Sequence, residues 1–487
     1  MKYLVGIDVG TSAVKTVLFD EKLNKIRSET VEYPLYQPHN GWAEQNPDDW
    51  WSATLRSLEK ATESVDRIDG IGLSGQMHGL VMLDRNGDVL RPAIIWCDQR
   101  TEKECTQITD IVGRDKLIEI TANPALTGFT ASKIMWVKNN EPEIYEKCRH
   151  ILLPKDYIRF KLTGVFKSEA SDAGGMQLLD IKNRVFSEEI LKLLGIEREL
   201  LPDVCESPDI TGYVNIKGKF FGTPVVGGAG DNAAAAVGCG AVREKRAFTT
   251  IGTSGVVYAH TDKPVIDTKG RVHTFCCAVP GKWHVMGVTQ SAGLSLKWFR
   301  ENFAPELTYS EMDNMAEKVR IGAEKLLFLP YLMGERTPHL DPNARGTFIG
   351  ISAIHTKAHF IRAILEGVAF SLRDCLEVLR EMDISVADMS MVGGGSSPLW
   401  QQIISGTFKI PIKTPFSNEG AALGVAILAA VGIGLYSDVP SACDKIIRNS
   451  APVFPENSAE YDKFYRIYAS VYPRLKEICR ELALTGK

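Results

Sequence analysis

The chain has 487 residues, with 56 basic and 60 acidic side chains and a formal net charge of -4. This length predicts two or three domains, because single hydrophobic cores stop growing near about 250–300 residues. The mild acidity provides no basic surface, so we expect neither nucleic acid nor a membrane as partner. Ten cysteines without a CxxC pair, and a start that runs straight into a strand pattern, predict a cytoplasmic protein with free thiols.

The opening of the chain predicts an antiparallel meander of three strands rather than a βαβ unit. A tight turn at Gly10-Thr11-Ser12 joins the first two strands. The alternation of apolar and polar residues places the three strands at residues 3–8, 14–19 and 26–33.

A helix follows the meander. Asn46 is expected to cap it, Pro47 fits its first position, and two acidic residues then favour the positive end of the helix dipole. Further on, residues 68–73 predict a short strand. Residues 81–84 and 89–90 flank an Asn-Gly pair and predict a hairpin.

Half a chain later the opening pattern recurs. Residues 247–258 again give a strand, Gly-Thr-Ser and a strand, and residues 273–288 continue as a hairpin. A duplicated domain is the economical explanation. We therefore predict an N-terminal domain over residues 1–243 and a C-terminal domain over residues 244–487. In the second domain, helices are expected at residues 360–382, 398–408, 421–431 and 459–484.

The two Gly-Thr-Ser turns are candidate phosphate-binding sites. Phosphoryl transfer needs positioned phosphates, a metal and a base for the incoming hydroxyl, and the chain contains neither GxxxxGK[ST] nor the protein-kinase motifs. Glycine turns can instead present backbone N–H groups to an anion. A structural β-turn is the alternative for one such turn alone. The candidate ATP-binding residues of the turns are Thr11, Ser12, Lys15, Gly252, Thr253 and Ser254.

Two acidic residues are candidates for the chemistry. Asp8 ends the first strand, where a hard oxygen ligand can hold Mg²⁺ through water. Asp231 follows the glycine-rich run at residues 227–230, which lets a ligand approach the backbone closely. Taken alone, Asp231 is more typical of a helix cap. The functional alternative is a general base that hydrogen-bonds a substrate hydroxyl.

A third glycine cluster, Gly393-Gly394-Gly395, lies between an apolar strand and a helix. Such a junction suits nucleotide binding at the helix N-terminus, and a plain tight connection is an equal alternative. By contrast, residues 70–75 match GxGxxG but place their glycines inside a strand, with no long helix after it. We therefore do not expect dinucleotide binding there.

The loop after the strand at residues 68–73 offers groups for a sugar. Gln76 and His78 can hydrogen-bond hydroxyls, and Met77 can pack on a carbon face, whereas a histidine satisfied within the loop is the alternative. Trp96 offers a stacking surface, and a surface salt-bridging segment is the alternative there. The dispersed histidines and cysteines give no zinc-ligand spacing.

Eight motifs are spread over nearly the whole chain: residues 6–12, 75–79, 91–96, 152–157, 230–234, 252–255, 334–339 and 419–424. In this combination the chain resembles the FGGY family of carbohydrate kinases. The resemblance implies an α/β, actin-like (ribonuclease H-like) fold of two duplicated domains around a central cleft. It also implies MgATP as phosphoryl donor. The Gln-Met-His-Gly segment is similar to that of members that phosphorylate D-xylulose at its 5-hydroxyl.

The resemblance also implies roles for individual residues. It makes Asp231 the catalytic base and places Asp8, together with Asp231, near the metal and the phosphates. It assigns the glycine clusters of the second half to phosphate and adenosine. The implied sugar contacts are Met77, His78, Asp231 and Asn232. A kinase for another ketose or polyol, such as ribulose or glycerol, and a catalytically silent sugar sensor stay open as alternatives, as does a homodimer.

Overall fold

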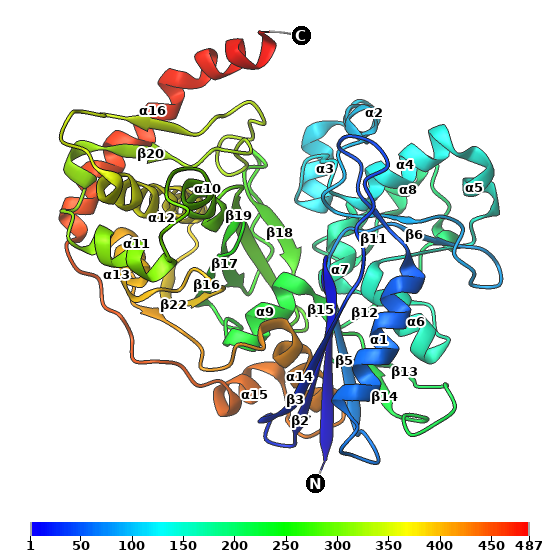
Figure 1. Ribbon diagram of the computed structural model, residues 1–487. Helices are drawn as coiled ribbons and strands as arrows, with labels where there is room; N and C mark the ends of the chain where they lie inside the picture. The colour runs from blue at the N-terminus through cyan, green and yellow to red at the C-terminus, as the bar shows by residue number, and fades with distance from the viewer. Residues whose placement is uncertain (1, 486–487) are drawn as a thin grey trace.

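The computed structural model describes residues 2–485, and two mixed β-sheets form its framework (Figure 1). In spatial order, the first sheet contains β13 (Ile210–Tyr213), β14 (Pro224–Val226), β5 (Gly70–Gly75), β1 (Tyr3–Val9), β2 (Ala13–Asp20) and β3 (Lys25–Glu32), and β15 (Ala229–Gly230) also pairs with β5. The second sheet contains β18 (His273–Cys276), β19 (Trp283–Thr289), β17 (Gly255–Thr261), β16 (Lys245–Ile251), β22 (Val386–Val392) and β23 (Ile412–Lys413).

The two sheets repeat one arrangement of strands. Strand β1 pairs antiparallel with β2 and parallel with β5, and β16 pairs antiparallel with β17 and parallel with β22. A further antiparallel strand lies beside each hairpin, β3 next to β2 and β19 next to β17. The duplication predicted from the two Gly-Thr-Ser segments is therefore confirmed in the strand order, which is that of an actin-like fold.

Helices and short strands complete both halves. The helices of the first half are α1 (Pro47–Ala61), α2 (Glu102–Val112), α3 (Arg114–Thr121), α4 (Thr130–Asn140), α5 (Pro142–Lys147), α6 (Pro154–Thr163), α7 (Ala170–Ala173), α8 (Glu188–Leu194) and α9 (Asp231–Cys239). Those of the second are α10 (Gly293–Phe303), α11 (Tyr309–Glu317), α12 (Lys357–Glu381), α13 (Pro398–Phe408), α14 (Gly420–Gly432), α15 (Val439–Ile446) and α16 (Ser458–Leu484). The short strands are β4 (Glu44–Gln45), β6 (Val81–Leu83), β7 (Ala93–Ile94), β8 (His150–Leu152), β9 (Lys167–Glu169), β10 (Leu179–Asp180), β11 (Val185–Phe186), β12 (Asp203–Cys205), β20 (Leu327–Leu329) and β21 (Thr347–Ile349). The four helices predicted in the second half are confirmed, within a few residues, as α12, α13, α14 and α16.

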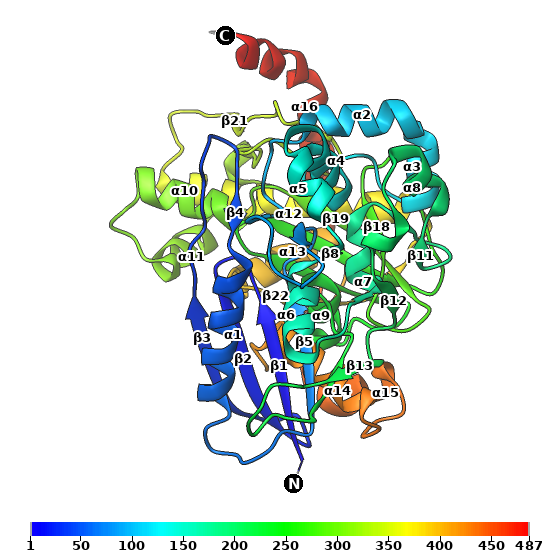
Figure 2. The same ribbon diagram turned by 90° about the vertical axis from the view of Figure 1, so that its right-hand side faces the viewer.

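The predicted start of the first helix is confirmed in detail. The Asn46 side chain accepts a hydrogen bond from the Asp48 N–H, and Pro47 occupies the first helical position. Helix α1 packs on β2 and β3 (Figure 2), with Trp50 and Leu58 fully buried beneath it. The sequence folds this way because its apolar residues recur at helical spacing on the face toward the sheet.

Helix α14 belongs to the second half of the chain but packs on the first sheet, against β1 and β5 (Figure 1). Two glycines permit this approach, because a Cβ at Gly6 would lie 1.9 Å from the Ala422 carbonyl oxygen and one at Gly72 would lie 2.0 Å from that of Val425. Gly72 of the GxGxxG stretch thus serves helix packing. The domain boundary between residues 243 and 244 stays a prediction. Helix α14 follows this boundary in the sequence but packs against the sheet of the first half.

The hairpin predicted around residues 81–90 is confirmed only in part. The turn forms, since Gly87 N–H donates to the Asp84 carbonyl oxygen. Beyond it, Leu83 and Val89 make a single bridge, and β6 forms its regular ladder with β8 instead. Strand β8 offers a longer and more buried partner than the residues after the turn, which explains the difference.

The predicted free thiols are confirmed, since none of the ten cysteines forms a disulfide. Among the described helices, none combines the length and apolar character needed to cross a membrane.

Candidate active site

The two candidate acids lie at the carboxyl ends of β1 and β15, two strands that flank β5 and run parallel to it. Asp8 of β1 pairs with Ser74 of β5, and Ala229 of β15 pairs with the same Ser74 on the other side. Asp231 follows Ala229 by two residues and opens helix α9. Because adjacent strands lie about 4.8 Å apart, the backbones of Asp8 and Ala229 are roughly 10 Å apart, and Asp231 follows two residues later at the same end of the sheet.

Burial and charge perturb both carboxyl groups. Burial raises the pKa of Asp231 to about 6, the charge of Asp8 adds to this rise, and hydrogen bonds from Asn232 oppose it. Asp231 Oδ1 accepts from the backbone N of Asn232 at 2.6 Å and from its Nδ2 at 2.9 Å. Burial also raises the pKa of Asp8, whose Oδ1 is buried without a hydrogen-bond partner among residues 2–485. Two buried carboxyl groups at the same end of the sheet favour binding of a proton or a cation.

The predicted sugar loop lies directly beside these acids. Gln76 leaves β5 and its N–H donates to the Val9 carbonyl oxygen at 2.8 Å. Met77 packs against Gly230, where a Cβ would lie 2.9 Å from the Met77 Sδ. The loop therefore borders the corner at which Asp231 enters its helix.

His78 has a neutral ring whose hydrogen bonding is fixed on one side. Its Nδ1 lies 2.8 Å from the Gly175 carbonyl oxygen, so Nδ1 carries the proton. Burial first, and then the positive charges of Lys133 and Arg336, together lower the pKa of His78 to about 3. Nε2 is consequently left with a lone pair that can accept a hydrogen bond from a hydroxyl.

Trp96 and the first Gly-Thr-Ser turn form a second border of this region. Trp96 is 45% exposed, and its Nε1–H donates to Thr11 Oγ1 at 2.9 Å. Ser12 is exposed in the same turn. Lys15 differs from the other predicted residues, because its Nζ forms an ion pair with Glu419 Oε2 at 2.6 Å.

No sequence pattern indicates a role for Gln45, which joins the turn to the loop. Gln76 Nε2 donates to Gln45 Oε1 at 2.7 Å, and Gln45 Nε2 donates to the Thr11 carbonyl oxygen at the same distance. The indole N–H of Trp50 also donates to Gln45 Oε1. The two buried amides thus fix the turn relative to the loop.

The remaining glycine clusters meet at the carboxyl ends of β16 and β22. Gly395 N–H donates to the Ile251 carbonyl oxygen at 3.1 Å, next to the Gly252 turn. A cavity of about 310 Å³ opens beside them, and Trp400 and residues near the starts of α10 and α11 also line it. Its lining includes Gly252, Thr253, Gly394, Gly395 and Tyr309. Ser254 and Gly393 lie next to this lining in sequence.

Arg336 reaches toward the sugar loop from the second half of the chain. Its neighbour Glu335 is buried and accepts hydrogen bonds from Thr289 Oγ1 and the Gln290 N–H, which anchors the segment. Burial lowers the pKa of His273 and the charge of Arg336 adds to that effect; for His78, the charge of Arg336 adds to the effects of burial and of Lys133. Arg336 lies in the motif at residues 334–339, but the sequence around it indicates no role, so Arg336 was not predicted as a site residue.

The strand order and the paired glycine turns, with two carboxyl groups at one strand edge, define a phosphotransferase of the actin-like fold class. Residues 3–238 match the N-terminal domain of the FGGY family of carbohydrate kinases, and residues 247–433 match its C-terminal domain. The chain belongs to this family.

Individual relatives are similar over nearly the whole chain. The xylulose kinase of Bacillus subtilis (strain 168) is 40% identical over 491 residues, which cover 98% of each protein. A gluconokinase of the same organism is 32% identical and covers 98% of this chain and 96% of its own. Among solved structures, that of a "xyloylose kinase" from Brucella ovis superposes with a TM-score of 0.93 at 36% identity, covering 98% of this chain and 100% of its own.

Proposed function

We propose that this chain transfers the γ-phosphoryl group of ATP to the 5-hydroxyl of D-xylulose, with Asp231 as general base. The observation that carries the proposal is the position of Asp231, between the Met77–His78 loop and the strand edge that holds Asp8. The likeness to xylulose kinases over nearly the whole chain supports the choice of acceptor.

In this proposal the acceptor binds along the loop after β5. His78 Nε2 accepts a hydrogen bond from one sugar hydroxyl, and Asn232 and Gln76 bind others through their amides. Gln76 Oε1 suits this role because it is buried and has no partner among the described residues. Met77 and Trp96 pack on the carbon skeleton.

Asp8 and Asp231 fit a magnesium ion. Mg²⁺ in kinases is typically held by one or two carboxylates together with substrate phosphates and waters, and the described residues contain no larger cluster of metal ligands. The buried, unpartnered Oδ1 of Asp8 is an oxygen ligand of the required kind. When bound, the ion neutralises charge that develops on the transferred phosphate.

We propose that ATP lies between the two glycine turns. The phosphates contact Thr11 and Ser12 in the first half and Gly252, Thr253 and Ser254 in the second. Adenosine enters the cavity beside Trp400, with Gly393, Gly394 and Gly395 at its edge. Lys15 joins the phosphate contacts only when it leaves Glu419.

Asp231 acts in its ionised form. It accepts the proton of the 5-hydroxyl as that oxygen attacks the γ-phosphorus, and the bond to the β-phosphate oxygen breaks to release ADP. The hydrogen bonds from Asn232 hold the carboxylate in place while it does so. Loss of such a base costs about 10²–10⁴-fold in rate.

The test is an assay of ADP release with D-xylulose, D-ribulose, glycerol and gluconate as acceptors. We expect D-xylulose to have the highest kcat/KM. A tenfold or greater preference for another acceptor would reassign the substrate and leave the kinase activity standing.

Asp231→Asn tests the base separately. The variant is expected to bind the sugar in calorimetry as the wild type does, and to lose turnover. Wild-type-like turnover would remove Asp231 from the mechanism. Sugar binding by the wild type without ATP binding or ADP release would favour the silent-sensor alternative.

A further inference from the structure

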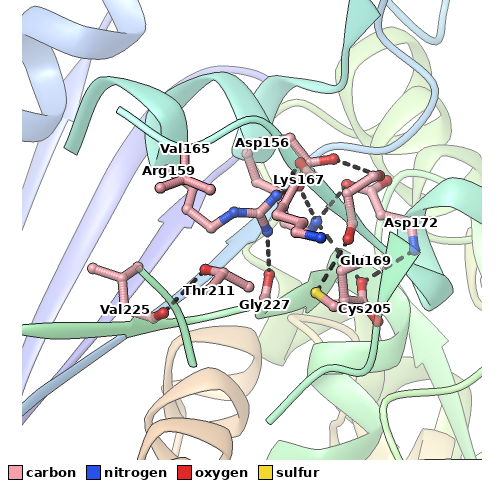
Figure 3. Close-up of polar contacts among 12 residues, drawn as sticks. Asp156, Arg159, Val165, Lys167, Glu169, Asp172, Cys205, Thr211, Val225 and Gly227 are labelled. Atoms are coloured by element: carbon pink, nitrogen blue, oxygen red, sulfur yellow. Dashed lines mark hydrogen bonds and ion pairs between the residues drawn. The ribbon is translucent and has the colours of Figure 1, made fainter. Parts of the chain in front are cut away.

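Five charged side chains form a fully buried group behind the candidate active site. Figure 3 labels Asp156, Arg159, Glu169 and Asp172 among them. We call it the buried ion cluster, and its members are Lys155, Asp156, Arg159, Glu169 and Asp172, each at most 1% exposed. Lys155 Nζ lies at its centre, 2.7 Å from Asp156 Oδ1, 3.2 Å from Asp172 Oδ2 and 3.8 Å from Glu169 Oε2. Arg159 forms a 3.0 Å ion pair with Asp156 Oδ1.

The charges of this cluster balance only if one carboxyl group keeps a proton. It holds two cations and three carboxyl groups, and an unpaired charge away from water is costly. Glu169 accepts hydrogen bonds from the Ser171 N–H and from the hydroxyls of Ser171 and Ser207. Asp172 receives no backbone N–H in the part of the chain that the structure describes. Asp172 is therefore the member that we expect to hold the proton.

The pKa of Asp172 agrees with this assignment. Burial raises it to about 8, the negative charges of Asp156 and Glu169 add to the rise, and Lys155 opposes it. Burial disfavours the charge on Lys155 itself, but the three carboxyl groups outweigh that effect and raise its pKa above the ordinary value. At neutral pH the cluster therefore contains two cations and two carboxylates.

The cluster fastens both ends of the segment that leads to Asp231. Arg159 Nη1 donates to the Gly227 carbonyl oxygen at 2.8 Å (Figure 3). At the other end, Gly230 N–H donates to Ser171 Oγ at 3.1 Å, and Ser171 Oγ donates to Glu169 Oε2 at 2.8 Å. The backbone of the residue before Asp231 is therefore tied to a buried carboxylate through one hydroxyl.

The same cluster also lies behind the sugar loop. A Cβ at Gly75 would come within 3.1 Å of the Lys155 Cβ, so Lys155 supports the strand end from which the loop leaves. Three residues after Asp172, the carbonyl oxygen of Gly175 pairs with His78 Nδ1. Displacement of Asp172 would thus be passed to the ring of His78 through a short, buried stretch of chain.

We infer that the buried ion cluster is a positioning device for Asp231 and His78, and that Asp172 serves it in the protonated form. This inference rests on the proposed function, because it concerns the geometry of the same transfer. Ionisation of Asp172 adds an uncompensated negative charge beside Asp156 and Glu169, which separates the carboxylates and shifts the attached backbone. A displacement of about 1 Å at a reacting group can cost about 10²-fold in rate.

The experiment compares Asp172→Asn with Asp172→Ala. Asparagine matches a protonated carboxyl group in shape and charge, so kcat near neutral pH should stay within about threefold of wild type, whereas alanine should lower kcat by about 10–100-fold. The KM for MgATP should change little in either variant. Asp203→Asn is the control, because it makes the same chemical change on a side chain that is 72% exposed.

The pH profile separates positioning from a merely structural role. As the pH rises through about 8, wild-type kcat should fall while that of Asp172→Asn does not. Lys133 donates to the His78 carbonyl oxygen, and burial lowers its pKa to about 7. Because Lys133 titrates in both proteins, its effect cancels in the ratio of the wild-type kcat to the kcat of Asp172→Asn. A ratio that stays constant across this range overturns the inference, whether or not Asp172→Ala folds. Absence of turnover by the wild type on every acceptor would instead overturn the proposed function.

Discussion

Replacement of Asp231 by asparagine should make the protein more stable while it lowers kcat by about 10²–10⁴-fold. The pKa of Asp231 rises from 3.8 to about 6 in the folded chain, mainly through burial and then through the charge of Asp8. A shift of about two units corresponds to roughly 3 kcal/mol against the ionised form, and we take this as an upper bound because Asp231 is only half-buried. Asparagine keeps the contact to Asn232 through its own Oδ1 and carries no charge.

The stability gained in Asp231→Asn depends on pH with a defined sign. Between pH 3.8 and about 6 the folded chain holds a proton on Asp231 that the unfolded chain has lost, so wild-type stability falls as the pH rises across this window. Below this pH window Asp231 does not lower the unfolding free energy, and above it the loss of unfolding free energy is complete. Asparagine does not titrate, so the unfolding free energy of Asp231→Asn should exceed that of the wild type by an amount that grows from pH 4 upward and levels off above pH 6.

The measurement is urea unfolding of both proteins, without ligands, at a series of pH values. The difference in unfolding free energy should follow a single titration centred between 3.8 and about 6. The same pKa predicts that kcat/KM for the acceptor falls about tenfold per pH unit below 6, since the free enzyme needs the ionised base. Equal stabilities at every pH, together with a flat rate profile in this range, would refute the assignment of a perturbed pKa to Asp231.

Three further variants test the packing around the site. In Gly72→Ala the new Cβ would lie 2.0 Å from the Val425 carbonyl oxygen, so unfolding free energy should fall by about 1–3 kcal/mol or more in urea titrations, and an unchanged midpoint would contradict the packing of α14. In Gly175→Ala the Cβ would lie 2.4 Å from His78 Nδ1, so we expect a KM for the acceptor raised about tenfold with KM for MgATP unchanged, and equal effects on both would argue for a general disturbance. Arg336→Gln removes a charge that lowers the pKa of His78, so NMR titration should show that pKa rising, and no change would place Arg336 away from the ring.

The local features of the fold could be predicted because their causes are local. The cap at Asn46, the strand hairpins and helix α13 depend on residues within a few positions of one another. Asp8 and Asp231 could be proposed from the sequence, since Asp8 lies near a strand end just before Gly10 and Asp231 follows Gly230 at the start of a helix. The effect of Asp8 on the pKa of Asp231 follows from two strand pairings that no spacing in the chain encodes.

The parts that could not be predicted depend on long-range contacts. Lys15 meets Glu419 across the whole chain, although its place in the turn motif suggested a phosphate contact. Lys155 lay in a recognised motif, but nothing in the spacing indicated that Glu169 and Asp172 fold back onto its Nζ. Gln45 lies in a two-residue strand and shows no pattern at all.

Because helix α14 packs on the sheet of the first half, the protein cannot be divided into two independent pieces at the predicted boundary. Ala422, Val425 and Ile427 share one hydrophobic core with Leu4 and Val17 of the first sheet. A polypeptide that stopped at residue 243 would expose that core surface to water and aggregate. Two separately produced pieces could regain a native core only by assembling with each other, so recovery of catalysis would depend on their concentration.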